Sequence, residues 1–192
     1  MNTLFEIEPP YPSGFQYFNN FITTEEEAEL LTEIKKVNLH TFTFQGFEAK
    51  RKVASFGYDY SFENGKLSKG KEIPERFTSL INKVAEKLSI PHDHFAELLL
   101  TEYPEGSVIN WHRDAPPFQL IAGISLQSDC IFKLRPHDKK KQGRGSVISL
   151  PVLRRSLYII DGPARSEWQH SIAPVKNTRY SITLRTLQVP IT

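Results

Sequence analysis

The heptapeptide Arg179-Tyr180-Ser181-Ile182-Thr183-Leu184-Arg185 alternates strictly between polar and apolar side chains. Because successive residues of a β-strand point to opposite faces, the alternation predicts a strand with one polar and one apolar face. The polar face carries both arginines, and burying them in a small β-fold would be costly unless anions met them. A dicarboxylate would supply such anions, since the planar guanidinium suits a carboxylate. If this face were exposed to solvent, both arginines would be ordinary surface charges.

This strand is the last of a series of short β-type runs that begins at residue 95 and contains no intervening helix. The runs are Phe95–Tyr103, Ser107–His112, Gln119–Gln127, Cys130–Arg135, Ser146–Leu150, Ser156–Ile160, Trp168–Ala173 and Arg179–Thr186. Strands that follow one another without helices favour a sandwich or barrel over a βαβ sheet. We therefore expect an α+β fold whose core is a double-stranded β-helix, or jelly roll.

The first half of the chain has a different pattern, which predicts two helices and a flap-like hairpin. Apolar residues repeat at helical spacing over Leu30–Val37, and Thr24 can form a capping box with Glu27 before them. A second apolar stripe of the same kind covers Phe77–Leu88. Residues 42–73 are aromatic, basic and punctuated by glycine, which is typical of a hairpin or flap.

Composition sets limits on the class of protein. The chain has 192 residues, 39% of them hydrophobic, which is enough for a packed core and excludes a wholly disordered chain. We expect one catalytic domain over residues 1–192, with helices and a substrate lid in 1–94 and the jelly-roll catalytic core in 95–187. The net charge of +2 is too small to indicate a partner by itself.

Cysteine content and hydropathy bear on the cellular compartment. Cys130 is the one cysteine, so the chain has no internal disulfide and no cysteine-rich metal site. The first residues lack the basic stretch and apolar run of a signal peptide, and no apolar run approaches the roughly 20 residues of a membrane span. We therefore expect a cytoplasmic, reducing compartment and no membrane association. We also expect a monomer.

Candidate metal ligands lie in the stretch Trp111-His112-Arg113-Asp114 and at His170. In extended backbone, residues two apart point to the same side, so His112 and Asp114 can converge on one metal ion. His170, in a later strand, can supply a third ligand. Two imidazoles and one carboxylate form the facial triad of non-haem iron(II) oxygenases. An isolated His-x-Asp is common by chance, and by itself it is typical of a solvated loop.

Taken together, these motifs resemble the AlkB family of iron(II)/2-oxoglutarate dioxygenases. The resemblance extends over residues 56–187 and rests on a small set of segments. They are Tyr103-Pro104-Glu105-Gly106, Trp111-His112-Arg113-Asp114, Gly123-Ile124-Ser125-Leu126 and the strand from Arg179 to Arg185, supported by Leu153–Leu157, Asp161–Arg165, Trp168 and His170.

The resemblance implies an oxidative demethylase and assigns roles to particular residues. His112, Asp114 and His170 would bind Fe(II) and form the catalytic centre. Arg179 would hold the distal carboxylate of 2-oxoglutarate, Arg185 would lie near its metal-side end, and Tyr103 and Thr101 would line the same site. Thr101 stands where the family often has asparagine. The implied reaction consumes O2 and 2-oxoglutarate, and releases succinate, CO2 and formaldehyde.

Nucleic acid is the substrate class that the resemblance implies. Phe56, Tyr58 and Tyr60 could stack on an unstacked base, with Arg51 nearby, although simple packing of the flap is the alternative. Basic residues that would suit a phosphate backbone are Lys66, Lys69, Lys71, Lys133, Arg135, Lys139, Lys140, Lys141 and Arg144. Such residues also occur in ordinary solvated turns.

One departure from the family concerns base recognition. Nucleobase-repair members usually place an acidic residue two positions after the metal-binding Asp, whereas Asp114 is followed by Ala115-Pro116-Pro117. This difference argues against 1-methyladenine or 3-methylcytosine as the lesion. The stretches Phe56–Tyr60 and Arg154–Leu157 are similar to the branch of the family that modifies tRNA.

We therefore expect an AlkB-like dioxygenase that removes N-alkyl groups from DNA or RNA, as in repair, on a single strand or a flipped base. Three alternatives stay open at this point. The same chemistry could act on a protein side chain, it could modify a tRNA base, or the chain could be a nucleic-acid-binding module without turnover.

Overall fold

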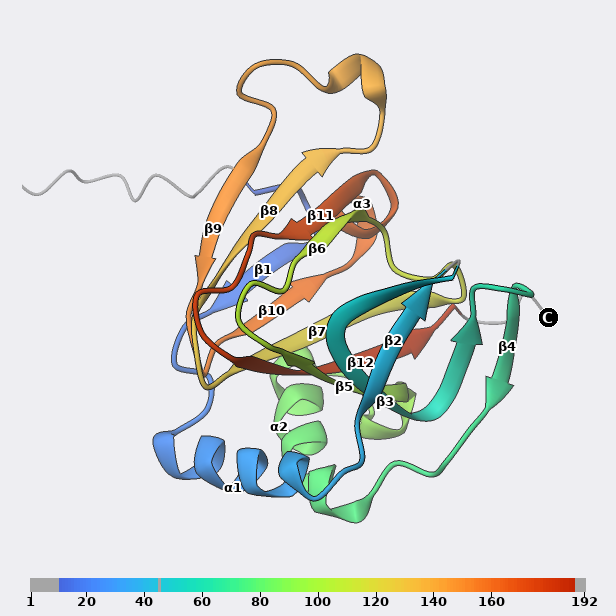
Figure 1. Ribbon diagram of the computed structural model, residues 1–192, viewed down its shortest axis with the longest axis vertical. Helices are drawn as coiled ribbons and strands as arrows, with labels where there is room; N and C mark the ends of the chain where they lie inside the picture. Colours follow the sequence, from blue (N-terminus) through green and yellow to red (C-terminus); the bar gives the residue numbers. More distant parts are fainter. Residues whose placement is uncertain (1–10, 45, 189–192) are drawn as a thin grey trace, which may run out of the picture.

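The computed structural model describes residues 11–44 and 46–188, in which two antiparallel sheets form the body of the molecule (Figure 1). The larger sheet has eight strands in the order β1, β10, β7, β12, β5, β3 and β2, with β4 paired to β3. The smaller sheet has four strands in the order β6, β11, β8 and β9. The jelly-roll architecture expected from the sequence is confirmed.

The eight strands predicted after residue 94 are all present, with ends that differ by a few residues, but the expected absence of a helix among them was wrong. A one-turn helix, Gly162–Ser166, lies between the sixth and seventh of these strands, with Pro163 in its first turn. The strands are β1 (Phe15–Phe18), β2 (His40–Phe44), β3 (Phe47–Ser61), β4 (Lys66–Lys69), β5 (Phe95–Tyr103), β6 (Ile109–His112), β7 (Phe118–Leu126), β8 (Cys130–Pro136), β9 (Ile148–Val152), β10 (Leu157–Ile160), β11 (Trp168–Ile172) and β12 (Arg179–Leu187). The helices are α1 (Thr24–Lys35), α2 (Thr78–Leu88) and α3 (Gly162–Ser166), with 3-10 turns η1 (Glu75–Phe77), η2 (His92–His94) and η3 (Lys139–Lys141).

The two faces of the larger sheet are buried against different partners. On β12, Tyr180, Ile182 and Leu184 belong to a buried cluster that includes residues of α1 and α2. A second buried cluster lies between the sheets and contains Tyr158 of the larger sheet and Phe132 of the smaller one. The alternation of β12 therefore directs its apolar face to the helices and its polar face to the space between the sheets.

Strands from the N-terminal half of the chain complete the larger sheet. β1 pairs with β10, and residues 52–57 of β3 pair with β5. Strands from the N-terminal half therefore belong to the same sheet as the core strands. Among the described residues, no helix is long and apolar enough to cross a membrane. Residues 1–10, on which the expected absence of a signal peptide rests, lie outside the described part of the chain.

The predicted flap is a ribbon of β3 and β4 that leaves the larger sheet at Gly57. Up to Gly57, β3 pairs with β5, and from Tyr58 onward it pairs with β4. Gly57 has a φ of +83°, and a Cβ atom there would lie 2.1 Å from the Ala96 carbonyl oxygen. Only glycine fits this bend, because it tolerates positive φ and leaves room for the neighbouring backbone.

Helix α1 begins one residue earlier than the capping box proposed from the sequence. Thr23, not Thr24, is the N-cap, and its hydroxyl accepts from the Glu26 N–H while the Glu26 carboxylate accepts from the Thr23 N–H. The motif permits both alignments, and tertiary contacts select the observed one. In this alignment Glu27 faces the jelly roll instead of closing the helix terminus.

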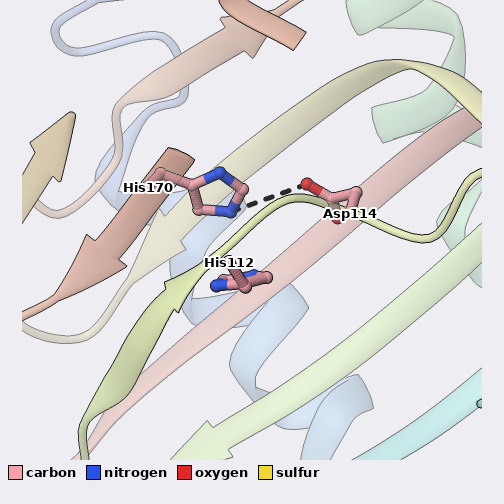
Figure 2. Close-up of side chains that lie close together, drawn as sticks. All are labelled: His112, Asp114 and His170. Carbon is pink, nitrogen blue, oxygen red and sulfur yellow. Dashed lines mark ion pairs between the residues drawn. The ribbon is translucent and has the colours of Figure 1, made fainter. Parts of the chain in front are cut away.

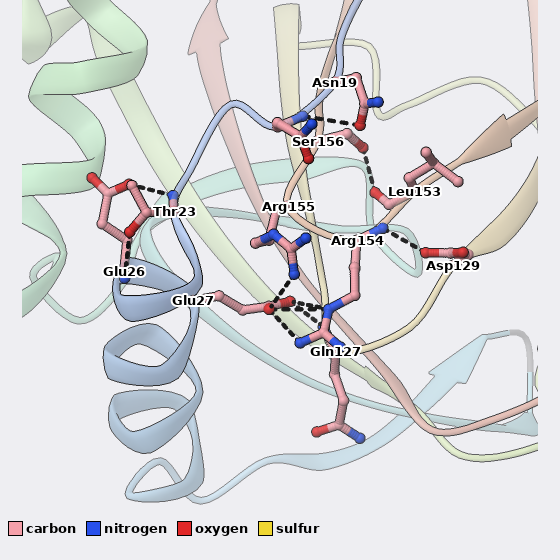
Figure 3. A network of polar contacts seen from close by, with 11 residues as sticks. Asn19, Thr23, Glu26, Glu27, Gln127, Asp129, Leu153, Arg154, Arg155 and Ser156 are labelled. Atoms are coloured by element: carbon pink, nitrogen blue, oxygen red, sulfur yellow. Dashed lines mark hydrogen bonds and ion pairs between the residues drawn. The ribbon is translucent and has the colours of Figure 1, made fainter.

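Glu27 joins α1 to two turns of the jelly roll (Figure 3). Its side chain is 1% exposed, and its carboxylate accepts hydrogen bonds from Nε and Nη2 of Arg154 and from the Gln127 N–H. The Arg155 guanidinium lies 3.4 Å away. Burial by itself would raise the pKa of Glu27, but these hydrogen bonds hold that pKa below its ordinary value. The carboxylate therefore stabilises the fold in its charged form.

We predict that Glu27→Gln lowers the free energy of unfolding by about 2 kcal/mol at pH 7, because charge-assisted hydrogen bonds at a buried site are lost. Denaturant unfolding measures this difference. The matched control is Glu29→Gln on the exposed side of the same helix, which should change stability by less than about 0.5 kcal/mol.

The pH dependence of this difference follows from the lowered pKa of Glu27. The stabilisation is complete above the unfolded-state pKa of about 4.3 and is lost as the pH falls through the lower folded-state pKa. The gap between the wild type and Glu27→Gln should therefore narrow below about pH 4. Equal stability of the two proteins at pH 7 would show that the contact contributes nothing.

Candidate active site

His112, Asp114 and His170 come together between the two sheets (Figure 2). His112 ends β6, Asp114 follows it in the connecting loop, and His170 lies on β11 directly opposite His112. One ligand atom from each of the three residues lies within 4.8 Å of the others. The structure thus assembles the candidate metal ligands identified from the sequence.

Each imidazole is oriented by a neighbouring group. Nδ1 of His112 lies 2.9 Å from the Asn110 carbonyl oxygen, and because a carbonyl only accepts, Nδ1 is the donor in this contact. The contact leaves Nε2 of His112 as the nitrogen that can face a metal ion. The ring of His170 stacks on Phe132, and burial, aided by nearby His112, lowers the pKa of His170 to about 3.

The two carboxylate oxygens of Asp114 have different surroundings. Oδ1 accepts from Nη2 and Nε of Arg185, at 2.7 and 3.1 Å. Oδ2 is buried, has no hydrogen-bond partner among the described residues, and lies 3.5 Å from Nε2 of His170. Burial favours the neutral acid, but the Arg185 charge and the neighbouring histidines outweigh it and lower the pKa of Asp114 well below its usual range. An unpartnered anionic oxygen facing a neutral imidazole is the arrangement that a divalent cation would satisfy.

Arg185 is occupied by two carboxylates of the protein itself. Its Nη1 donates to Oε2 of Glu97 at 2.5 Å, while Nη2 and Nε serve Asp114. Although burial favours the neutral guanidine, these carboxylates raise the pKa of Arg185 and keep it charged. The sequence predicts that Arg185 lies near the metal-side end of 2-oxoglutarate. In the structure, Nε, Nη1 and Nη2 of Arg185 are already bound to Asp114 and Glu97.

Arg179 presents the opposite situation, a fully buried guanidinium with free donors. It is 0% exposed, its Nε donates to Oγ of Ser125 at 2.9 Å, and its guanidinium lies 4.9 Å from the centre of the Tyr103 ring. Nη1 and Nη2 are buried and have no hydrogen-bond partner among the described residues. A buried cation with two free N–H donors could bind a carboxylate.

The remaining walls of this anion site are polar and come from adjacent strands. Tyr103 is paired with Arg179, and Thr101 is paired with Ser181, so all four lie on one face of the sheet. Oγ of Ser181 is buried without a hydrogen-bond partner among the described residues. These positions place polar groups beside Arg179, an environment that could suit the distal carboxylate of 2-oxoglutarate.

The four sequence-based substrate residues are separated by the structure. Phe56 is 9% exposed and packs in the helix-side cluster, which assigns its ring to the core. Tyr58 and Tyr60 lie on the ribbon beyond Gly57, and Tyr60 packs against the inter-sheet cluster. The Arg51 guanidinium lies over the Phe42 ring at 3.9 Å.

Several residues of the site were not identified from the sequence. Glu97 and Ser125 contact the two arginines, and the half-exposed Phe62 meets Tyr60 edge to face at 5.1 Å. Arg165 donates to the carbonyl oxygens of Asp114 and Ala115, which fixes the loop after the metal ligands. The register of β5 on β12, which places Glu97 opposite Arg185, is the signal that would have identified Glu97.

Comparisons with known proteins agree with this geometry. A family model described as the 2OG-Fe(II) oxygenase superfamily matches residues 14–185. The chain is 27% identical over 177 residues to tRNA (carboxymethyluridine(34)-5-O)-methyltransferase alkbh8 of Xenopus tropicalis, covering 88% of this chain and 27% of that protein. It is 30% identical over 152 residues to RNA demethylase ALKBH5 of Bos taurus, covering 67% of this chain and 37% of that protein.

The chain spans about a quarter of the length of the alkbh8 relatives. Among solved structures, OsALKBH1 is similar with a TM-score of 0.72 and 11% identity, covering 90% of this chain and 96% of that one. At this level of identity the structural similarity concerns the fold.

We predict that Asp114→Asn weakens the binding of Mn(II), used as a redox-stable substitute for Fe(II), by about two orders of magnitude or more, because the anionic ligand is lost. Isothermal titration calorimetry measures the affinity. Asp59→Asn, on the exposed surface of β3, is the matched control and should bind Mn(II) as the wild type does. Unchanged affinity in Asp114→Asn would exclude the metal assignment.

We predict that Arg179→Gln has opposite effects on the free and the liganded protein. Without ligand, removing an unpaired buried charge should raise the melting temperature by about 2–4 °C. With 2-oxoglutarate added, the wild type should gain stability by mass action while the variant should gain little. Thermal unfolding with and without 2-oxoglutarate tests both effects, with Arg144→Gln as an exposed control. Equal stabilisation of variant and wild type by 2-oxoglutarate would exclude Arg179 as its anchor.

Proposed function

The chain belongs to the 2OG-Fe(II) oxygenase superfamily as a member of AlkB type, and from this premise we propose that it removes N-alkyl groups from RNA by oxidation. It is a dioxygenase that uses Fe(II), 2-oxoglutarate and O2. When bound, the iron centre supplies an oxidation that converts 2-oxoglutarate to succinate and CO2 and hydroxylates an N-methyl group, which then leaves as formaldehyde.

The protein's own residues prepare this chemistry. His112, Asp114 and His170 would hold the metal ion, and because they are three ligands, positions would remain for the cosubstrate and O2. Arg179 offers two free donors to the distal carboxylate of the cosubstrate. The surrounding walls of buried side chains exclude water from the space between the sheets.

The observation that carries the substrate proposal is the β3–β4 ribbon. It presents the aromatic pair Tyr60 and Phe62, with the Phe62 ring half exposed, and Tyr60 also packs against the inter-sheet cluster. Lys66 and Lys69 are exposed on the neighbouring strand β4. An aromatic surface flanked by lysines suits stacking on an unpaired base and neutralisation of its phosphate.

RNA is favoured over DNA by the relatives, whose names describe a tRNA-modifying enzyme and an RNA demethylase. The absence of an acidic residue two positions after Asp114 is consistent with a base other than 1-methyladenine or 3-methylcytosine. DNA repair stays a prediction from the sequence, as do the monomeric state and the cytoplasmic location. The second candidate is oxidation of a modified tRNA base, which the similarity to alkbh8 over 88% of this chain favours.

A second basic region lies on the hairpin that joins β8 and β9, which extends away from the sheets in Figure 1. Lys139–Lys141 and Arg144 are exposed there. Arg135 lies on the outer face of the smaller sheet, with its guanidinium 4.4 Å from the centre of the Trp111 ring and its Nε bonded to Gln169. These residues face away from the metal ligands, so we propose that they hold the backbone of an RNA whose target base reaches the ribbon.

We predict that N-methylated single-stranded RNA stimulates succinate release by the iron-loaded protein, with an equivalent amount of formaldehyde. The assay uses matched panels of methylated and unmethylated RNA and DNA oligonucleotides and modified tRNA. Asp114→Asn should abolish turnover and keep RNA binding largely intact, because binding rests on the ribbon and the hairpin. Phe62→Ala should raise the KM for RNA and leave the KM for 2-oxoglutarate unchanged.

The outcomes separate the candidate functions. Stimulation by tRNA without formaldehyde would favour base hydroxylation over demethylation. Binding of RNA should weaken with rising salt, with a slope near −0.7 per phosphate contact. A flat salt response together with no stimulation by any nucleic acid would reject the proposal.

A further inference from the structure

Glu97 is a buried acidic residue for which metal binding and cosubstrate binding give no role. It lies on β5, is 3% exposed and faces the space between the sheets, in register with Arg185 on β12. Its Oε2 accepts from Nη1 of Arg185 at 2.5 Å, and its Oε1 accepts from the Ser55 hydroxyl at 3.1 Å. Burying a carboxylate costs free energy, which the contacts of Glu97 must offset.

The contacts of Arg185 indicate what Glu97 does at this position. A guanidinium can bind one carboxylate through two parallel N–H groups and can reach both oxygens of that carboxylate. Here Nη1 is bound by Glu97, and the two remaining contacts of Arg185 both go to Oδ1 of Asp114. Oδ2 of Asp114 is consequently left without a hydrogen-bond donor among the described residues and lies toward His170.

The arrangement around Arg185 points the same way. Asp114 and Glu97 flank one Arg185, and each of them contacts a different part of its guanidinium. Without Glu97, Nη1 of Arg185 would be released to approach the second oxygen of Asp114. That change would oppose the binding of a divalent cation at this oxygen.

We propose that Glu97 is a positioning residue for the metal centre, which restrains Arg185 on Oδ1 of Asp114 and so reserves Oδ2 for the metal ion. Glu97 acts through Arg185 and does not touch the metal. The inference rests on the metal-binding role given to Asp114 under the proposed function, and it is independent of which substrate is oxidised.

Ser55 extends this arrangement to the substrate ribbon. Its hydroxyl lies 3.1 Å from Oε1 of Glu97 and 3.4 Å from the Tyr58 carbonyl oxygen. Ser55 precedes the bend at Gly57 and Tyr58 follows it. A hydroxyl has one hydrogen and donates to one acceptor at a time. The contact to the Glu97 carboxylate is the shorter one, so Ser55 restrains Glu97 at the oxygen that Arg185 does not contact.

The test measures metal binding in the absence of nucleic acid and 2-oxoglutarate. Glu97→Gln keeps the size of the side chain and should weaken Mn(II) binding about tenfold. It should also change the visible absorption spectrum of bound Co(II), which reports ligand geometry. Ser55→Ala should weaken Mn(II) binding about two- to threefold, a smaller change in the same direction because Arg185 still holds Glu97.

Glu102→Gln is the matched control on the same strand. Glu102 points to the opposite face of the sheet and pairs with Lys52 at 3.3 Å. This variant should leave both the Mn(II) affinity and the Co(II) spectrum unchanged.

A double-mutant comparison separates action through Arg185 from a general loss of charge or fold. In an Arg185→Gln background, Glu97→Gln should have less than about a twofold further effect on Mn(II) affinity. Thermal unfolding identifies variants that fail to fold. If Glu97→Gln does not fold, the Mn(II) affinity of Ser55→Ala is the test.

The outcomes distinguish this inference from the proposed function. Wild-type affinity and spectrum in both Glu97→Gln and Ser55→Ala would overturn the positioning role alone. A tenfold effect that persists in the Arg185→Gln background would also overturn it. Failure of the wild type to bind Mn(II) would overturn the metal-binding role on which the proposed function itself depends.

Discussion

Two arginines on the polar face of β12, the fully buried Arg179 and the partly buried Arg185, are the constraint on which the rest of the site depends. A guanidinium cannot lose its proton at neutral pH, so each buried arginine requires an anion. Arg185 finds two within the chain, Asp114 and Glu97, whereas Arg179 finds none among the described residues. One end of the strand is therefore a completed ionic group that orients a metal ligand. The other end is an incomplete one that a dicarboxylate can complete.

The jelly roll makes this difference possible because it buries both faces of the larger sheet. Ile182 and Leu184 are covered by the helices, and the polar face is covered by the smaller sheet. Electrostatic interactions are stronger in such a space than at a protein surface. The same covering brings β6 and β11 of the smaller sheet over β12, and so places His112 and His170 beside Asp114.

Features that depend on short-range patterns could be predicted from the sequence, whereas features that depend on strand register could not. The alternation from Arg179 to Arg185 and the spacing of His112 and Asp114 are local, and both predictions agree with the structure. Glu97 lies far from Arg185 in sequence and becomes its partner only through the pairing of β5 with β12. The sequence predicts the capping box at Thr24, one residue after its true position at Thr23. The contacts of Glu27 that fix the alignment are tertiary and could not be seen in the local pattern.

The bend at Gly57 joins the candidate metal centre to the ribbon that we propose recognises the substrate. Before the bend, β3 is part of the larger sheet and places Ser55 against Glu97; after it, the same strand forms the ribbon that carries Tyr60. A Cβ atom at Gly57 would collide with the Ala96 carbonyl, which immediately precedes Glu97 in β5. The position of the ribbon is thus fixed by the backbone next to the residue that restrains Arg185. Because one strand joins both sites, the contacts of Ser55, Glu97 and Arg185 form a continuous series from the ribbon's base to Asp114.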